Sequence, residues 1–414
     1  LAEEFSSGET FGPKGPVLAT RQVAALELRT EDVPREAAGT LPLLVEWNGF
    51  LQPPETGEFN LGVNAEGSFA SVAIGGRQIA QEFIMNQPGM HAKVGHIHLE
   101  QGKKVAIKMV YSRTKPGPAR AQLIWSKYDP APDPAAIAAA KNADVVIAVL
   151  GITSQLEGEE MPVTEDGFKG GDRTSLDLPK PERQLLEALA TTGKPVVLVL
   201  ANGSALSVNW AKEHVNAILE SWYSGEEGGA AVAETISGKN NPAGRLPVTF
   251  YTGVGQLPPF EDYSMNGRTY RYFDGKPLFP FGYGLSYTTF SYRGLQLPRH
   301  TINAGGPLTV IATVTNTGKR EGDEVAQLYL SFPKVPGAPL HALRGFRRIH
   351  LLPGESRNVR FELRSRDLSM VTEQGQIIVA AGTYTVSIGG GQPDSGAASI
   401  AGAFQVRGTK LLPE

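Results

Sequence analysis

The 414-residue sequence contains no cysteine and no long apolar run. Without cysteine there can be no disulfides, no thiolate metal ligands and no cysteine nucleophile. No apolar run reaches the roughly 20 residues that a membrane-spanning helix needs. The first residues, LAEEFSSGET, include no initiator methionine and neither the basic nor the apolar segment of a signal peptide. We therefore predict no membrane partner, and we expect any targeting segment to lie outside this sequence.

A strong excess of charge is also missing, since 39 Lys and Arg stand against 42 Asp and Glu and the formal net charge is -3. Such a chain has no long-range attraction for a phosphate backbone, so we predict that nucleic acid is not a partner. The length predicts two or three domains, each with its own core.

Residues 1–130 contain no convincing helical stretch. Apolar and polar residues alternate there in short runs between turn residues, which is typical of β-strands. The string FASVAIGGRQIA predicts a hairpin that turns at Gly75 and Gly76. We expect an all-β sandwich or barrel.

Residues 131–267 have a different pattern, in which apolar runs alternate with helical segments. Asp133 and Pro134 are typical of the start of a helix. The runs DVVIAVLG, KPVVLVLANG and VNAILESWY predict buried strands, and PERQLLEALATTG and GEEGGAAVAETISG predict the helices between and after them. This alternation favours an α/β domain with a mainly parallel sheet and helices on both sides.

Residues 291–414 return to short alternating strands such as LTVIATVTNTG and GTYTVSIGG. Their spacing predicts a β-sandwich of the fibronectin type III kind. The intervening residues 268–290 are rich in aromatics, Gly and Pro, and we expect this connector to pack across the domain boundary.

Five strings in this order resemble the C-terminal half of glycoside hydrolase family 3, the β-glucosidase and β-xylosidase group. They are NPAGRLPVTFY, RTYRYF, PLFPFGYGLSYTTF, VTNTGKREGDEVAQLYL and LRGFRRIHLLPGES. VEWNGFLQPPETGEFNLGVNAEGSFASVAIGG resembles the PA14 domain that many members carry near the active-site mouth. The resemblance implies a PA14-like domain at 1–130, the α/β domain at 131–267 and the fibronectin-like domain at 291–414.

The loop GITSQLEGEEMPVTEDGFKGGDR crowds acidic residues together. This loop resembles the acidic loop of the family, which usually has the pattern W-E-x-E-G-x-D-R. The first Glu of that pattern is the family's catalytic acid/base. By that resemblance Glu157 is the acid/base and Glu159 the second choice, while Asp172 and Arg173 support the loop. Leu156 replaces the Trp, and an inserted stretch separates the two halves of the motif. Such crowding of carboxylates raises the pKa of an acid toward the range that a retaining glycosidase needs.

The plainer interpretation is that the acidic loop is simply solvated. Arg173 would then form a structural ion pair with Asp172 or another loop carboxylate. Trp47 and Trp222 could stack on sugars, although an isolated Trp more often belongs to a core. His91, His96 and His98 lack a supporting carboxylate pattern, so we predict no metal. No cofactor is expected either.

The family's nucleophile is an Asp on a (β/α)8 barrel, and neither that barrel nor the opening strand of the α/β domain is found in this sequence. We therefore expect the barrel on a missing segment or a separate chain, with an oligosaccharide or β-glycoside as substrate. An exo-acting retaining β-glucosidase is the first choice, and a β-xylosidase is the alternative. The family also implies a periplasmic or secreted protein; a homodimer stays open, and no sugar-binding residue can be named.

Two other classes of function compete with this one. A non-catalytic carbohydrate-binding or adhesion protein would explain the two β domains, but not the acidic loop. A serine hydrolase is disfavoured because no G-x-S-x-G string is present.

Overall fold

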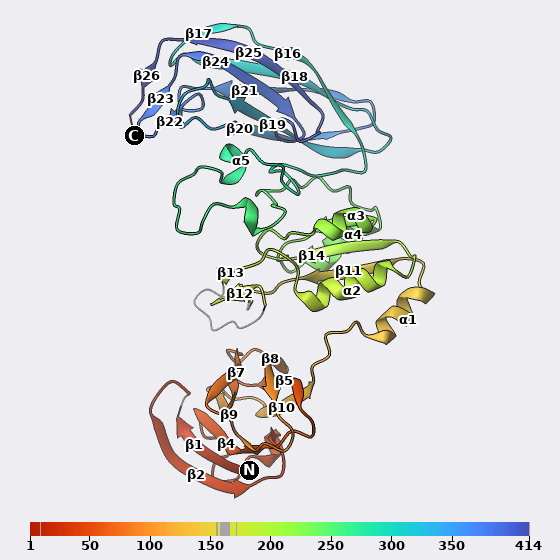
Figure 1. Ribbon diagram of the computed structural model, residues 1–414, viewed down its shortest axis with the longest axis vertical. Coiled ribbons are helices and arrows are strands. Elements are labelled where there is room, and N and C mark those ends of the chain that lie inside the picture. Colours follow the sequence, from red (N-terminus) through yellow and green to blue (C-terminus); the bar gives the residue numbers. More distant parts are fainter. Residues whose placement is uncertain (9, 155, 158–165, 171, 414) are drawn as a thin grey trace. The chain divides into compact units, whose positions relative to one another are not determined.

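The computed structural model describes residues 1–413 except 9, 155, 158–165 and 171. The chain divides into two compact units, Leu1–Pro130 and Ala131–Glu414, called here the N-terminal and C-terminal units (Figure 1). Among the described residues, no helix is both long and apolar enough to cross a membrane.

The N-terminal unit consists of two antiparallel sheets, with strand orders β2-β1-β4-β9-β6-β7 and β3-β10-β5-β8. Its elements are β1 (Ala2–Gly8), β2 (Lys14–Gln22), β3 (Glu27–Leu28), the short 3₁₀ helix Thr30–Asp32, β4 (Leu43–Leu51), β5 (Gly57–Glu66), β6 (Phe69–Ile74), β7 (Arg77–Phe83), β8 (His91–Leu99), β9 (Val105–Arg113) and β10 (Arg120–Lys127). Strands of both sheets contribute to a single core, in which Trp47, Leu61 and Tyr111 are fully buried.

The predicted hairpin is confirmed, because β6 pairs antiparallel with β7. Gly75 and Gly76 have φ angles of 57° and 82°. This left-handed backbone at both turn positions is the one that glycine adopts without steric cost, and its twist matches the twist of the flanking strands.

The C-terminal unit begins with the α/β part. Its elements are α1 (Pro134–Asn142), β11 (Val146–Gly151), β12 (Phe168–Lys169), β13 (Asp172–Arg173), α2 (Lys180–Ala190), β14 (Val196–Ala201), α3 (Asn209–His214), β15 (Ala217–Glu220), α4 (Gly228–Ile236), the 3₁₀ helix Val254–Gln256 and α5 (Thr269–Tyr272). The helix start at Asp133 is confirmed, since its side chain accepts a hydrogen bond from the backbone N–H of Ala135 and Pro134 is the first helical residue.

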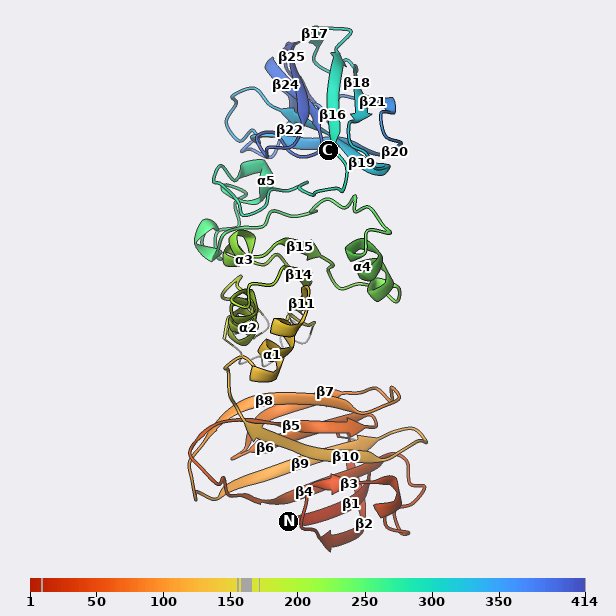
Figure 2. The ribbon, with the colours of Figure 1, turned by 90° about the vertical axis from the view of Figure 1, so that its right-hand side faces the viewer.

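Strands β11, β14 and β15 form a parallel sheet in the order β11-β14-β15. Figure 2 shows α2 and α3 on one side of the sheet and α4 on the other. Edge strand β11 turns Ala148 into the core, whereas Ile147 and Val149 on its other face are 48% and 63% exposed. Parallel sheets are normally covered on both faces, so this edge leaves apolar surface uncovered.

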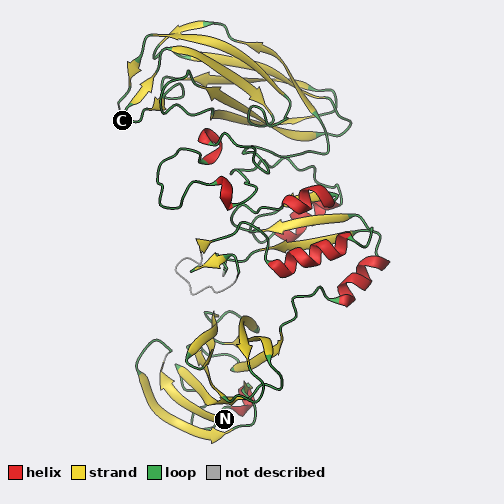
Figure 3. Cartoon of the chain, viewed as in Figure 1, coloured by secondary structure: helices red, strands yellow, loops and turns green. Residues whose placement is uncertain are grey.

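The rest of the C-terminal unit is a β-sandwich (Figure 3). Its main sheets have the orders β16-β18-β21 and β17-β25-β24-β19-β20, and β22-β23-β26 form a small third sheet. The strands are β16 (Phe290–Gln296), β17 (Thr301–Asn303), β18 (Leu308–Asn316), β19 (Gly322–Ser331), β20 (Ala342–Leu351), β21 (Ser356–Leu363), β22 (Met370–Val371), β23 (Ile377–Val379), β24 (Gly382–Gly389), β25 (Ser399–Arg407) and β26 (Lys410–Leu411). Buried and half-buried residues alternate along all of β18, as one core-facing side requires.

The aromatic connector packs against both the α/β part and the sandwich, as its composition predicted. The ring of Tyr270 stacks on Phe281 with centroids 4.0 Å apart, and its hydroxyl accepts a hydrogen bond from the backbone N–H of Leu343. On the other side, Phe279 lies edge-on to Phe250 of the α/β core.

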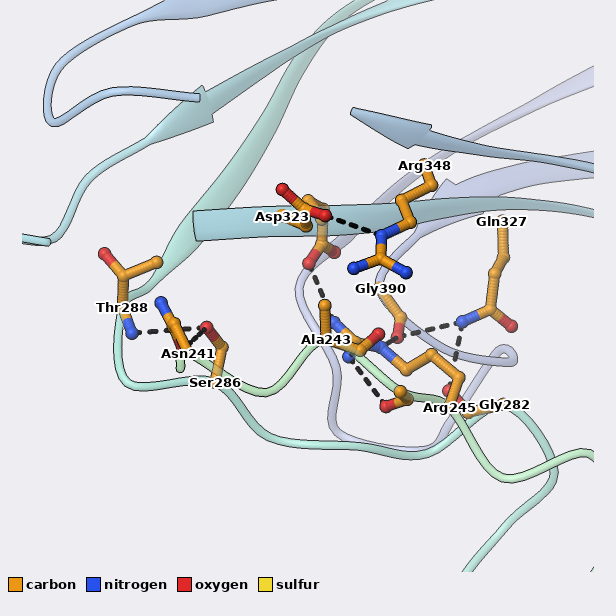
Figure 4. A network of polar contacts seen from close by, with 12 residues as sticks. Asn241, Ala243, Arg245, Gly282, Ser286, Thr288, Asp323, Gln327, Arg348 and Gly390 are labelled. Atoms are coloured by element: carbon orange, nitrogen blue, oxygen red, sulfur yellow. Dashed lines mark hydrogen bonds and ion pairs between the residues drawn. The ribbon is translucent and has the colours of Figure 1, made fainter. Parts of the chain in front are cut away.

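A buried ion pair joins the α/β part to the sandwich (Figure 4). A guanidinium nitrogen of Arg245 lies 2.8 Å from the Glu324 carboxylate, and the two side chains are 9% and 3% exposed. Arg245 also donates hydrogen bonds to the carbonyls of Ala243, Gly244 and Gly390. The hydroxyl of Tyr292 donates to the second oxygen of Glu324 at 2.5 Å. Both charged groups therefore have partners in place of water.

Candidate functional site

The candidate site lies where the three parallel strands of the α/β part end. Gly151 ends β11, Asn202 follows β14 and Glu220 ends β15. The carboxyl ends of neighbouring parallel strands meet at one edge of a sheet, which is where α/β proteins bind their ligands.

Glu157, the predicted acid/base, is held at this edge by three hydrogen-bond donors. One carboxylate oxygen accepts from the hydroxyl of Ser204. The other accepts from the backbone N–H of Gly203 at 3.2 Å and from the hydroxyl of Tyr223 at 2.5 Å. Two of these donors follow β14 and the third follows β15, so two strand ends orient a single carboxylate.

Gly203 is glycine because no side chain fits at this position. A Cβ there would lie 2.6 Å from the Tyr223 ring and 2.8 Å from a carboxylate oxygen of Glu157. The backbone can therefore approach the carboxylate closely enough to donate to it.

Burial raises the pKa of Tyr223, and the hydrogen bond to Glu157 raises it further. The phenol therefore stays protonated over the working range of pH. Tyr223 can act as a donor toward Glu157 throughout that range.

Arg173 was expected to form an ion pair with Asp172 or another loop carboxylate, and among the described residues no ion pair with Asp172 is found. Its guanidinium donates to the carbonyls of Ser175 and Asp177 and to the Ser204 hydroxyl, at 2.9, 3.2 and 3.1 Å, respectively. It also lies over the Phe168 ring. Burial lowers the pKa of Arg173, and the nearby charge of Glu157 opposes that change. The turn after β13 folds back around the guanidinium. Backbone carbonyls and the Ser204 hydroxyl therefore accept the hydrogen bonds that Asp172 was expected to accept.

Of the predicted acidic cluster, the structure describes Glu157, Asp166 and Asp172. Asp172 is exposed in β13. In the antiparallel register its backbone lies opposite that of Lys169 in β12. Glu159, the second choice for the acid/base, lies outside the described residues, as do Glu160 and Glu165. The preference for Glu157 over Glu159 therefore stays a prediction.

Two further carboxyl groups at this edge were missed from the sequence. Burial raises the pKa of Glu220 to about 7, opposed by hydrogen bonds from the Trp222 backbone and the Asn202 side chain. Burial also raises the pKa of Glu182, which accepts a hydrogen bond from the Gly151 N–H at 2.8 Å. For Glu220 a signal was present, since this carboxylate directly ends the apolar run AIL of a predicted buried strand.

The remaining sequence candidates are placed as follows. Trp47 is fully buried in the N-terminal core, so it cannot stack on a sugar. Trp222 packs against Phe250 in the α/β core. His98 pairs with Glu58, and within the described part of the chain no group of three or more His, Asp or Glu could hold a metal ion.

Comparison with known proteins gives two family matches. The glycosyl hydrolase family 3 C-terminal domain matches residues 39–287, a range that begins inside the N-terminal unit. The fibronectin type III-like domain matches residues 324–392.

Curated relatives include a xylan 1,4-beta-xylosidase of Xylanibacter ruminicola, 39% identical over 80% of this chain and 39% of its own length. A beta-xylosidase of Formosa agariphila is 44% identical over 62% of this chain and 35% of its own length. A periplasmic beta-glucosidase of Salmonella typhimurium is 33% identical over 90% of this chain and 47% of its own length. The chain thus spans less than half of the length of each of these relatives.

Solved structures give the same family of folds. A beta-glucosidase from Kluyveromyces marxianus matches 99% of this chain and 50% of its own, with 25% identity and a TM-score of 0.62. A beta-glucosidase from Listeria innocua, solved with glucose, matches 66% of this chain and 38% of its own, with 31% identity and a TM-score of 0.56.

Proposed function

Because this chain belongs to glycoside hydrolase family 3, we propose that it is the C-terminal part of an exo-acting retaining β-glycosidase and that Glu157 is the general acid/base. The observation that carries this proposal is the placement of Glu157 at the carboxyl edge of the parallel sheet. Three donors from two strand ends orient its carboxylate there.

In a retaining mechanism, Glu157 first donates a proton to the glycosidic oxygen as the bond between that oxygen and the anomeric carbon breaks. An Asp carboxylate attacks the anomeric carbon and forms a glycosyl-enzyme. Glu157 then removes a proton from water, which attacks the same carbon and releases the sugar. Ser204, Gly203 and Tyr223 fix the direction of the Glu157 carboxylate in both steps.

The nucleophilic Asp is proposed to lie on a (β/α)8 barrel, on a further segment or on a separate chain. Two observations support a further segment. The relatives are more than twice as long as the parts that match. Edge strand β11 also exposes the apolar side chains of Ile147 and Val149, which another element could cover. We expect this chain alone not to hydrolyse glycosides at a useful rate.

The substrate is proposed to be an oligosaccharide or β-glycoside with a terminal glucose or xylose at the non-reducing end. The sequence alone favoured glucose. The two β-xylosidases are 39% and 44% identical to this chain and the periplasmic β-glucosidase is 33% identical, which favours xylose. The name of the Salmonella relative supports a periplasmic or secreted location.

The N-terminal unit is proposed to be a PA14-like domain. Its support is the antiparallel two-sheet fold and a family match that starts at residue 39, within this unit, and continues to residue 287.

The test is Glu157→Ala in an enzyme that contains both this chain and the barrel. The kcat/KM for alkyl glycosides, whose leaving groups need protonation, should fall by about 10²–10⁴-fold, while kcat/KM for dinitrophenyl glycosides, which reports only formation of the glycosyl-enzyme, should be far less affected. Glu226→Ala, which removes an exposed carboxylate after β15, is the matched control and should leave both rates unchanged. Equal losses for both substrates would contradict the role of Glu157. The same leaving-group dependence in Glu159→Ala, and not in Glu157→Ala, would transfer the role to Glu159.

A further inference from the structure

Two separate segments supply the donors around Glu157, and their relative position decides whether the three hydrogen bonds can form together. Gly203 and Ser204 follow β14, whereas Tyr223 follows β15. The parallel pairing of β14 with β15 ends at Leu200 and Glu220. One backbone hydrogen bond follows, from the Ser221 N–H to the Leu200 carbonyl at 2.9 Å, and after it side-chain contacts join the two segments.

Glu220 connects the two segments directly. One of its carboxylate oxygens accepts from the backbone N–H of Trp222 at 3.0 Å, and the other accepts from the side-chain amide of Asn202 at 3.3 Å. The same Asn202 nitrogen donates to the carbonyl of Ser204 at 2.9 Å. The Glu220 carboxylate therefore contacts Trp222, the residue before Tyr223. Through the Asn202 amide it is also connected to Ser204, which donates to Glu157.

The hydrogen bonds around Asn202 are buried, and Trp222 has an unfavourable backbone conformation. Asn202 is 0% exposed, so water cannot replace its partners. Trp222 has a φ angle of 54°, which is rare for a bulky residue and persists only where its surroundings impose it. Its N–H is the group that Glu220 binds, so Glu220 helps to impose the conformation that places Tyr223.

We infer that Glu220 is a positioning residue for Glu157, which it serves by setting the Gly203–Ser204 turn and Tyr223 in register. The inference rests on the proposed role of Glu157 as acid/base. In this role Glu220 acts through Asn202 and Trp222. Within the described residues Glu220 forms no ion pair, and its two hydrogen-bond partners are both neutral.

An ionised carboxylate suits this role because it presents two acceptors to two donors, and with a pKa of about 7 Glu220 is in this form above neutral pH. Glutamine in its place would turn one acceptor into an N–H group that faces either the Trp222 N–H or the Asn202 amide. Rotating the Asn202 amide to accept from that glutamine would place its oxygen against the Ser204 carbonyl. Glu220→Gln therefore breaks the connection while keeping the volume of the side chain.

The test uses the 414-residue chain labelled with fluorotryptophan or fluorotyrosine and observed by ¹⁹F NMR, with Trp222→Phe and Tyr223→Phe for assignment. Glu220→Gln should move the Trp222 signal and should also move the Tyr223 signal in the direction that Glu157→Ala moves it. Ser221→Ala is the matched control. It removes the hydrogen bonds of the Ser221 hydroxyl to the carbonyls of Leu200 and Trp222, at 2.7 and 3.4 Å, and neither of them involves Asn202 or the Trp222 N–H. It should leave the Tyr223 signal in place.

Two results would overturn the inference. One is a Tyr223 signal that stays in the wild-type position in Glu220→Gln. The other is an equal displacement in Ser221→Ala, which would mean general loosening of the segment. If Glu220→Gln does not fold, titration of the wild-type chain decides, because the Trp222 and Tyr223 signals should then share one midpoint near pH 7. Different midpoints would refute the connection.

A kinetic measurement on the enzyme with its barrel separates this inference from the proposed function. Glu220→Gln should lower kcat for alkyl glycosides by up to about 100-fold with little change in KM, because only the orientation of the acid is lost. If Glu157→Ala shows no leaving-group dependence, the proposed function fails, while the NMR result still decides whether Glu220 links the two segments.

Discussion

Replacing Arg245 with methionine should destabilise the C-terminal unit, because it leaves the Glu324 carboxylate buried without its cation. The charged atoms lie 2.8 Å apart, and the side chains are 9% and 3% exposed. At an effective dielectric constant of roughly 20, their attraction is about 6 kcal/mol before desolvation is counted. Removing one partner of such a pair costs about 3–5 kcal/mol, because the remaining charge stays out of water. The corresponding fall in Tm is roughly 10 °C.

The assay is thermal and urea unfolding of the 414-residue chain, followed in the transition of the C-terminal unit. The matched control is Arg348→Met, which removes an ion pair with Asp323 whose side chains are 66% and 26% exposed. This change should cost no more than about 1 kcal/mol. The double variant Arg245→Met with Glu324→Met should recover much of the loss, because no unpaired charge remains. Equal small shifts for Arg245→Met and Arg348→Met would refute the reasoning.

Three other perturbations have defined outcomes. Trp47→Ala should lower the unfolding free energy of the N-terminal unit by about 3–5 kcal/mol in urea unfolding, because a fully buried indole leaves a cavity. Gly203→Ala should displace Tyr223 and Glu157, whose atoms lie 2.6 and 2.8 Å from the added Cβ, and the ¹⁹F signal of fluorotyrosine 223 should report it. The pKa of Glu220 is about 7 in the folded chain against an ordinary 4.5, so its stabilising contribution is full below pH 4.5 and is lost as the pH rises through 7. Glu220→Gln should therefore flatten the fall in unfolding free energy between pH 4.5 and 7, and an unchanged fall would exclude Glu220 as its source.

Local sequence signals predicted the secondary structure well where a few neighbouring residues decide it. Asp133 and Pro134 start α1 as expected, because capping depends on groups within one helical turn. Gly75 and Gly76 form the predicted hairpin turn, because both positions need a left-handed backbone. The strand in residues 144–151 was found from its apolar content, but the expected burial on both faces was wrong, because Ile147 and Val149 on one face of β11 are exposed.

The expectation for Arg173 shows where neighbouring charges mislead. Asp172 is adjacent in sequence and other carboxylates lie in the same loop, so an ion pair with one of them was the expectation. In the structure the guanidinium is half-buried among carbonyls and the Ser204 hydroxyl, which lies 31 residues further along the chain. A single arginine can reach several acceptors, and only the path of the backbone after β13 determines which of them are near.

The sequence by itself determined the succession of β, α/β and β regions and, through family resemblance, pointed to Glu157. It did not reveal the groups that hold this carboxylate. Gly203, Ser204 and Tyr223 lie 46, 47 and 66 residues after Glu157, respectively. Glu220 contacts Asn202 across 18 residues. Periodicity, caps and turns act over a few residues, whereas these contacts exist only because the order β11-β14-β15 brings distant strand ends to one edge of the sheet. The tertiary structure alone decides which side chains meet there.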